Sequence, residues 1–172
     1  ISFHTSAVVG MVAIIIKRFN LSIKLLVNFY ILSTLLMVIG VNQKVMLGIV
    51  SIVGGSLGDS IIKYSSDSIL SRYGLTNRMD FLIFTTFWLV LALWFKSRYL
   101  KEDSMYEWLI KSYIGLSIVY ILFGFIGYSD RLAAYAWFLI PVILFYPIIK
   151  MKSKYRLIWL ISSIAIIIVM FI

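Results

Sequence analysis

Arg131 is the residue whose position points most directly to anion binding. It belongs to the short polar segment 128–131, which separates two apolar stretches, so we expect it at the start of a helix. Ser129 or Asp130 can cap this helix, whose N-terminus carries free N–H groups and partial positive charge. An arginine adds a bidentate donor that suits phosphate. The alternative is an interfacial arginine that pairs with Asp130.

His4 is the second candidate for chemistry. A helix that runs from His4 to Lys17 rises about 19 Å at 1.5 Å per residue, which places His4 at the expected depth of Arg131. Ionisable groups inside a bilayer are costly and usually face a functional cavity, and histidine is suited to proton transfer near neutral pH. The alternative is a histidine that hydrogen-bonds to a neighbouring helix.

The segment 59–80 mixes basic and aromatic side chains. Lys63, Arg72 and Arg78 alternate here with tyrosines such as Tyr64. Tyrosine rings pack against sugar rings and arginines bind phosphate, so this composition suits a ligand that carries both. The alternative is a solvated amphipathic loop.

Metal and cofactor chemistry has little support in this sequence. The chain has no cysteine and one histidine, which excludes thiolate zinc sites, iron–sulfur clusters and sites with several histidines. The acidic residues Glu102, Asp103 and Glu107 lack metal-ligand spacing, and no phosphate-binding loop or dinucleotide motif is present. We therefore predict no metal and no cofactor.

The elements that position these residues follow from composition. Of the 172 residues, 62% are hydrophobic and only 13% are charged. A soluble domain of this size cannot bury that excess, so the class expected is an all-α, polytopic integral membrane protein. In so apolar a chain, the net charge of +9 is explained by lysine and arginine residues in cytoplasmic loops. We therefore expect no nucleic-acid partner.

About six transmembrane helices are expected within a single domain, residues 1–172, because each needs roughly 17–25 apolar residues. The first is truncated, since the chain opens on Ile1. We therefore expect the chain to be the C-terminal part of a longer one. The predicted spans are 1–16, 25–41, 81–95, 112–128, 132–149 and 157–172.

Loop charge sets the expected orientation. Most basic residues lie in the segments 17–24, 96–111 and 150–156, and six spans place all three on the cytoplasmic side, as the positive-inside rule requires. The glycine-rich stretch 45–58 is then an interfacial or re-entrant segment within a longer extracytoplasmic loop, 42–80.

Two stretches resemble a known family. Residues 3–7 (FHTSA) resemble the start of a transmembrane helix in bacterial O-antigen and exopolysaccharide polymerases of the EpsG and Wzy types. The stretch 129–141, with Arg131, Tyr135 and Pro141, is similar to a late helix of these proteins. The resemblance covers most of the chain, as roughly the C-terminal half of a typical member.

The resemblance implies an enzyme of the glycosyltransferase type in the bacterial cytoplasmic membrane, with its active side facing outward. Such enzymes transfer a growing glycan from undecaprenyl diphosphate to a sugar hydroxyl of the next lipid-linked unit. Arg131 matches the family motif and would stabilise the leaving diphosphate, while His4 or an outer aspartate would serve as the base. The predicted catalytic residues are thus His4 and Arg131, and the predicted substrate-binding residues are Lys63, Tyr64, Arg72, Arg78 and Asp130.

The expected partners are the undecaprenyl-diphosphate-linked glycan, membrane lipid, and chain-length regulator and flippase proteins. Two other readings stay open: a flippase or transporter of lipid-linked saccharide, and a non-catalytic membrane partner in glycan assembly. Transport should place charges along a path through the membrane centre, whereas the ionisable groups here gather at the outer edge.

Overall fold

The computed structural model describes residues 7–73 and 76–150, together with residues 156, 160–161 and 164. Over this part of the chain the secondary structure is helical, with no strand. The bounds of the helices are α1 (Ala7–Arg18), α2 (Ile23–Ile39), α3 (Asn42–Val53), α4 (Gly55–Tyr64), α5 (Asp67–Tyr73), α6 (Met79–Tyr99), α7 (Ser104–Leu122), α8 (Ser129–Trp137) and α9 (Ile140–Lys150).

Two segments of the described chain are long and apolar enough to cross a membrane. They are α6 and the segment Ser129–Lys150, which holds α8 and α9. A third span is possible if α2 and α3, which bend by 111° at their junction, count as one broken span. An all-helical membrane protein is therefore supported, whereas six spans are not. Most of the predicted span 157–172 lies outside the described residues.

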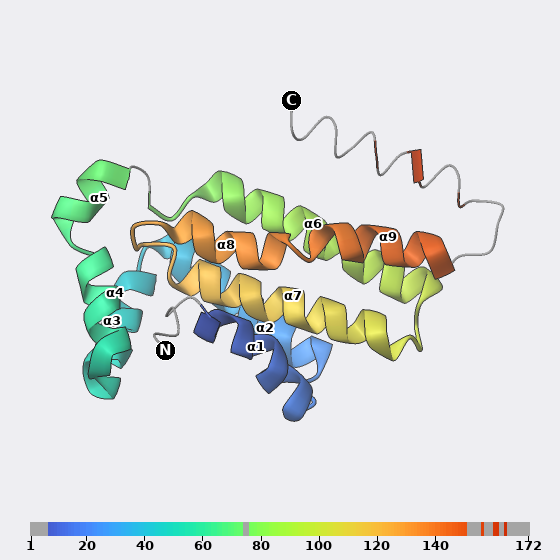
Figure 1. The fold of residues 1–172 in the computed structure, drawn as a ribbon, viewed down its shortest axis with the longest axis horizontal. Coiled ribbons are helices and arrows are strands. Elements are labelled where there is room, and N and C mark those ends of the chain that lie inside the picture. The colour runs from blue at the N-terminus through green and yellow to red at the C-terminus, as the bar shows by residue number, and fades with distance from the viewer. Residues whose placement is uncertain (1–6, 74–75, 151–155, 157–159, 162–163, 165–172) are drawn as a thin grey trace.

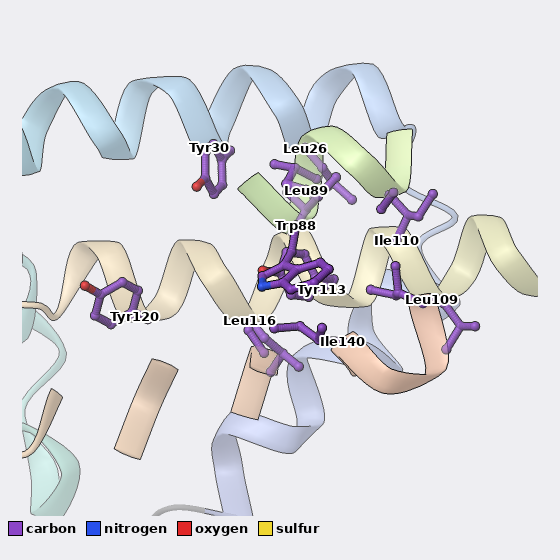
Figure 2. Close-up of a cluster of buried hydrophobic side chains, with 14 of the residues drawn as sticks. Leu26, Tyr30, Trp88, Leu89, Leu109, Ile110, Tyr113, Leu116, Tyr120 and Ile140 are labelled. Atoms are coloured by element: carbon purple, nitrogen blue, oxygen red, sulfur yellow. The ribbon is translucent and has the colours of Figure 1, made fainter. Parts of the chain in front are cut away.

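Helix α7 is the centre of the bundle. It packs against α1, α2, α6, α8 and α9, and Figure 1 shows these helices around it. Figure 2 shows side chains from α2, α6, α7 and α9 meeting in one buried cluster, with Trp88 beside Tyr113. The Tyr113 hydroxyl donates to the Thr85 carbonyl oxygen at 2.9 Å, which satisfies its polar group inside this core.

Helices α3, α4 and α5 gather at one end of the bundle (Figure 1). Gly40 ends α2 with φ of +78°, a left-handed conformation that glycine adopts without steric cost. The chain turns there into α3. The predicted outer segment 42–80 is thus largely helical, and its 111° bend from α2 is the shape of a broken span or re-entrant loop.

The connection between α6 and α7 differs from the long basic loop 96–111 that the sequence predicted. Lys96 and Arg98 belong to α6 and Lys111 belongs to α7, because both helices continue past the apolar residues. Lys111 is buried, and its amino group lies 2.7 Å from the Glu107 carboxylate. Ion pairing with Glu107, which also binds Lys96 at 2.8 Å, compensates the burial of this charge.

The helical segment that contains Pro141 is interrupted just before this proline. Helix α8 ends at Trp137 and α9 begins at Ile140, so the chain leaves regular helix just before this proline. A proline lacks the N–H that would continue the hydrogen-bond ladder, and it disfavours helical geometry in the preceding residue. Pro147 lies within α9 without ending it.

Candidate anion and glycan site

A hollow of about 410 Å³ lies where the segment before α6 meets the turn between α7 and α8. We call it the arginine hollow. It brings Arg78, predicted from the sequence as a substrate-binding residue, and Arg131, predicted as a catalytic one, together from distant parts of the chain. The lining residues are Leu70, Tyr73, Thr76, Arg78, Phe81, Ile126, Gly127, Tyr128, Ser129, Asp130 and Arg131.

Arg131 lies in the first turn of α8 and is exposed. Its guanidinium carbon is 4.4 Å from the centre of the Tyr128 ring, a distance typical of a cation–π contact. The ion pairs formed by the described residues do not include one between Arg131 and Asp130. The structure therefore does not support the alternative of a paired interfacial arginine, and the guanidinium remains available to an anion.

Arg78 immediately precedes α6 and has a different environment. Its guanidinium pairs with Asp80, with Nε at 3.1 Å from Oδ1, and lies 3.7 Å from the centre of the Phe81 ring. The hydrogen bond to Asp80 raises the pKa of Arg78, and the negative charges of Asp80 and Asp130 add to this shift. Arg78 is thus held in place with its charge balanced in part by Asp80, whereas the ion pairs of the described residues do not include Arg131.

The start of α8 corrects one expectation. The residue at the cap position is Tyr128, and among the side chains described there none accepts a hydrogen bond from the first turn. Ser129 and Asp130 are the first helical residues and do not cap the helix. The reason is that Tyr128 has a left-handed backbone, with φ of 65°. The Arg131 N–H donates to the Tyr128 carbonyl oxygen at 3.0 Å, whereas the N–H groups of Ser129 and Asp130, together with the helix dipole, favour negative charge at this end.

Tyr128 is also the centre of an aromatic cluster. Its ring centre lies 3.9 Å from that of Tyr73 and 5.9 Å from that of Tyr64. The hydrogen bond with Tyr73 raises the pKa of the Tyr128 hydroxyl. Three tyrosines and Arg131 therefore meet in one place, and such rings offer flat surfaces to a sugar.

The other predicted residues lie at different distances from this hollow. Tyr64 borders it through its ring contact with Tyr128, and its carbonyl oxygen accepts a hydrogen bond from the Gly127 N–H at 2.9 Å. Lys63 is exposed in the last turn of α4, outside the lining. The backbone of Arg72 belongs to α5, but its side chain and the whole of His4 lie outside the described residues.

The model of the EpsG family matches residues 1–172. This chain belongs to the EpsG family. The family consists of polysaccharide polymerase-like proteins of the EpsG and Wzy type. No curated protein and no solved structure matches the chain. Family membership and the apolar helices together indicate a membrane protein of polysaccharide biosynthesis.

Two asparagines support the arginine hollow of this EpsG family protein, and the sequence did not point to either. The Asn42 side-chain amide donates to the Asn77 side-chain oxygen at 2.9 Å, and Asn42 is fully buried. The Asn77 backbone N–H donates to the Gly124 carbonyl oxygen at 2.7 Å. These bonds join the start of α3, the residue before Arg78 and the end of α7.

Gly127 holds the turn before α8 close to α5. A side-chain carbon at this position would lie 2.7 Å from a methyl carbon of Ile69, closer than packed atoms allow. Any other residue at this position of the EpsG family protein would therefore push Ile69 or the turn away, next to the contact between Tyr128 and Tyr73. Spacing alone did not indicate Tyr128 and Gly127, because both contacts join residues far apart in the chain.

Metal-binding side chains do not gather at this site. No group of three or more histidine, cysteine, aspartate or glutamate residues occurs within the described part of the chain. Asp130 is the acidic residue among those that line the hollow, and it is exposed, while Asp80 pairs with Arg78 from outside the lining.

Proposed function

We propose that this EpsG family protein is a polysaccharide polymerase that uses a lipid-diphosphate-linked glycan as its donor. Family membership supports a polymerase-type activity in general. The finer proposal is that the arginine hollow binds the diphosphate of the donor and the sugars beside it.

One observation carries this proposal: Arg78 and Arg131 converge on one hollow from the starts of two different helices. Their planar guanidinium groups can each donate two hydrogen bonds to the oxygen atoms of a diphosphate, which offers several acceptors. The uncapped start of α8 adds N–H donors and partial positive charge. The rings of Tyr64, Tyr73 and Tyr128 stand beside these donors and suit the neighbouring sugars.

The proposed reaction is a glycosyl transfer. The oxygen of an acceptor sugar hydroxyl bonds to the anomeric carbon of the growing glycan, and the bond from that carbon to the lipid diphosphate breaks. The electron pair of the broken bond leaves with the diphosphate. Arg131 stabilises the added negative charge because its guanidinium has no carboxylate partner in the described structure. Arg78, which lines the same hollow, helps to orient the diphosphate.

The acceptor hydroxyl loses its proton to a base in this scheme. We propose His4 first, with Asp130 as the outer aspartate that would replace it. Asp130 lines the arginine hollow. The proposed orientation puts the hollow on the outer face of the cytoplasmic membrane, since the basic ends of α1, α6 and α9 lie at the opposite end of the bundle.

Complementation of a strain that lacks this gene tests the proposal. Arg131→Ala should reduce long polymer by about 100-fold, as expected for the loss of a donor to a developing negative charge. Arg78→Ala should reduce it less, because Asp80 already partly neutralises this arginine. The readout is the glycan ladder on a gel, with equal membrane expression verified by immunoblot.

Arg98→Ala is the matched control, since Arg98 is an exposed arginine in the last turn of α6 and lies outside the hollow. It should leave the ladder unchanged. Lipid-linked units should accumulate on the outer side of the membrane in the Arg131→Ala strain. A normal ladder from Arg131→Ala would overturn the role of this residue, and accumulation on the inner side would support a flippase.

A further inference from the structure

A second hollow lies at the other end of α6. It has a volume of about 510 Å³ and opens between the start of α2 and the end of α6, next to the turn that leads into α7. We call it the lysine hollow. Its charged residues are Lys24, Lys96 and Lys101. The proposed polymerase reaction uses none of them.

The charge balance of the lysine hollow is positive. Lys24 and Lys101 are exposed, and neither takes part in the ion pairs found among the described residues. Lys96 is largely buried, binds Glu107 at 2.8 Å and donates to the Lys101 carbonyl oxygen at 3.1 Å. Glu107 is the carboxylate beside this cluster, and Lys111 also binds it. The positive charge of Lys24 and Lys101 is thus left without a counter-ion in the lining.

Apolar side chains form the rest of the wall. Ile23 and Val27 come from α2, and Leu93 comes from α6. The surfaces of both helices continue from the hollow as exposed apolar side chains, among them Phe29 and Val90. A soluble anion would bind the lysines and make no contact with these apolar side chains. An amphipathic ligand would contact both the lysines and the apolar side chains.

The position along α6 fits such a ligand. Helix α6 is a candidate membrane span of 21 residues, and Lys96 lies in its last turn. Lysines at the end of a span lie at the level of lipid headgroups. Asn28 also lines the hollow and offers amide N–H donors to a phosphate, while the Ser97 hydroxyl, which donates to the Trp94 carbonyl oxygen at 2.9 Å, can accept a hydrogen bond from a glycerol hydroxyl.

We propose that the lysine hollow binds an anionic phospholipid, with its phosphate between Lys24 and Lys101 and an acyl chain along Ile23, Val27 and Leu93. Basic pockets between membrane helices hold anionic headgroups because each lysine near the membrane surface contributes to their attraction. This site is separate from the arginine hollow and does not depend on the polymerase proposal.

Native mass spectrometry of the purified full chain in neutral detergent tests this inference, with phosphatidylglycerol as the probe and phosphatidylcholine as the neutral comparison. We expect retained phosphatidylglycerol and at least tenfold weaker retention of phosphatidylcholine. Lys24→Gln combined with Lys101→Gln should weaken phosphatidylglycerol binding by roughly 30-fold. The conservative pair Lys24→Arg and Lys101→Arg should preserve it and show that the fold tolerates substitution.

Two further variants separate the parts of the site. Val27→Trp fills the apolar wall and should weaken phosphatidylglycerol binding without a change of charge. Lys44→Gln combined with Arg98→Gln removes the same charge outside the hollow and should leave binding unchanged. Equal retention of the two lipids, full binding by the double lysine variant, an equal loss in the control, or displacement by inorganic phosphate alone at the lipid's concentration would each overturn the inference.

Discussion

The two ends of α6 carry positive charge in different chemical forms. The arginine hollow combines Arg78 and Arg131 with tyrosine rings, whereas the lysine hollow combines three lysines with aliphatic walls. Arginine is a planar donor that makes paired hydrogen bonds and packs on rings, while lysine is a compact point charge. The first end is suited to orient one ligand in one pose, and the second is suited to attract a headgroup at a membrane surface.

The two ends also differ in how a helix begins. At the lysine end, the Asp103 carboxylate accepts a hydrogen bond from the Tyr106 N–H at 2.8 Å and caps α7. At the arginine end, α8 begins after Tyr128 without such a cap among the side chains described. A capped helix start is stable by itself, whereas an uncapped one keeps its N–H groups for a ligand. The lysine end therefore begins α7 with a side-chain cap, whereas the arginine end begins α8 without one.

The largest expected difference concerns the ion pairs. Glu107→Gln should destabilise the protein by roughly 3 kcal/mol, because it leaves the buried Lys111 ammonium without its counter-ion. Asp80→Asn should cost less than about 1 kcal/mol, since the Arg78–Asp80 pair is exposed to solvent. Denaturant unfolding in detergent micelles measures both changes. If the two variants lost the same free energy of unfolding, the ion pairs at the lysine end would not be stronger than the one at the arginine end.

A smaller effect is expected at the cap of α7. Asp103→Ala should cost about 1 kcal/mol, because the Tyr106 N–H and the Tyr146 hydroxyl both lose their acceptor. Those hydrogen bonds, chiefly the one from Tyr106, lower the pKa of Asp103. The contribution of ionised Asp103 to the stability of the folded protein is therefore complete at pH values above its unfolded-state pKa of about 3.9. It is lost as the pH falls through the lower pKa that Asp103 has in the folded protein.

Thermal unfolding from pH 7 to pH 3 measures this contribution. Asp103→Asn is the control, because asparagine keeps the cap acceptor but has no proton to gain. It should retain most of the stability at pH 7 and lose part of the acid dependence. If Asp103→Ala were as stable as the wild type at pH 7, the cap would contribute nothing to the lysine end.

The smallest effect is expected at Tyr128. Its left-handed backbone, with φ of 65°, is strained for a tyrosine or an alanine but not for a glycine. Relief of that strain by about 1 kcal/mol, less the greater backbone entropy of glycine, should leave Tyr128→Gly roughly 0.5 kcal/mol more stable than Tyr128→Ala. Thermal shifts of the two purified variants provide the measurement.

Both Tyr128 variants should lose glycan polymer equally, because both lack the ring that lies against Arg131 and Tyr73. A ladder restored by Tyr128→Gly alone would mean that backbone shape, and not the ring, matters at the arginine end. Greater stability of the alanine variant would show that the left-handed turn is not kept in solution.

Local patterns predicted part of this molecule well. Long apolar stretches indicated helices, and the helices α2 and α6 lie close to the predicted stretches 25–41 and 81–95. The polar segment 128–131 indicated the start of a helix, which begins at Ser129. Loop charge was less informative, because helices continue beyond their apolar residues. Lys111 was therefore predicted in a loop, although it is buried in α7.

The sequence by itself determined an apolar helical chain and the family to which it belongs, because composition and short motifs need no knowledge of packing. It also placed Arg131 at a helix start. Only the tertiary structure decided that Arg78 lies in the same hollow, that Tyr128 joins Tyr64 and Tyr73, and that Arg131 has no carboxylate partner among the described residues. These relations join residues far apart in the chain, and helix packing alone sets them.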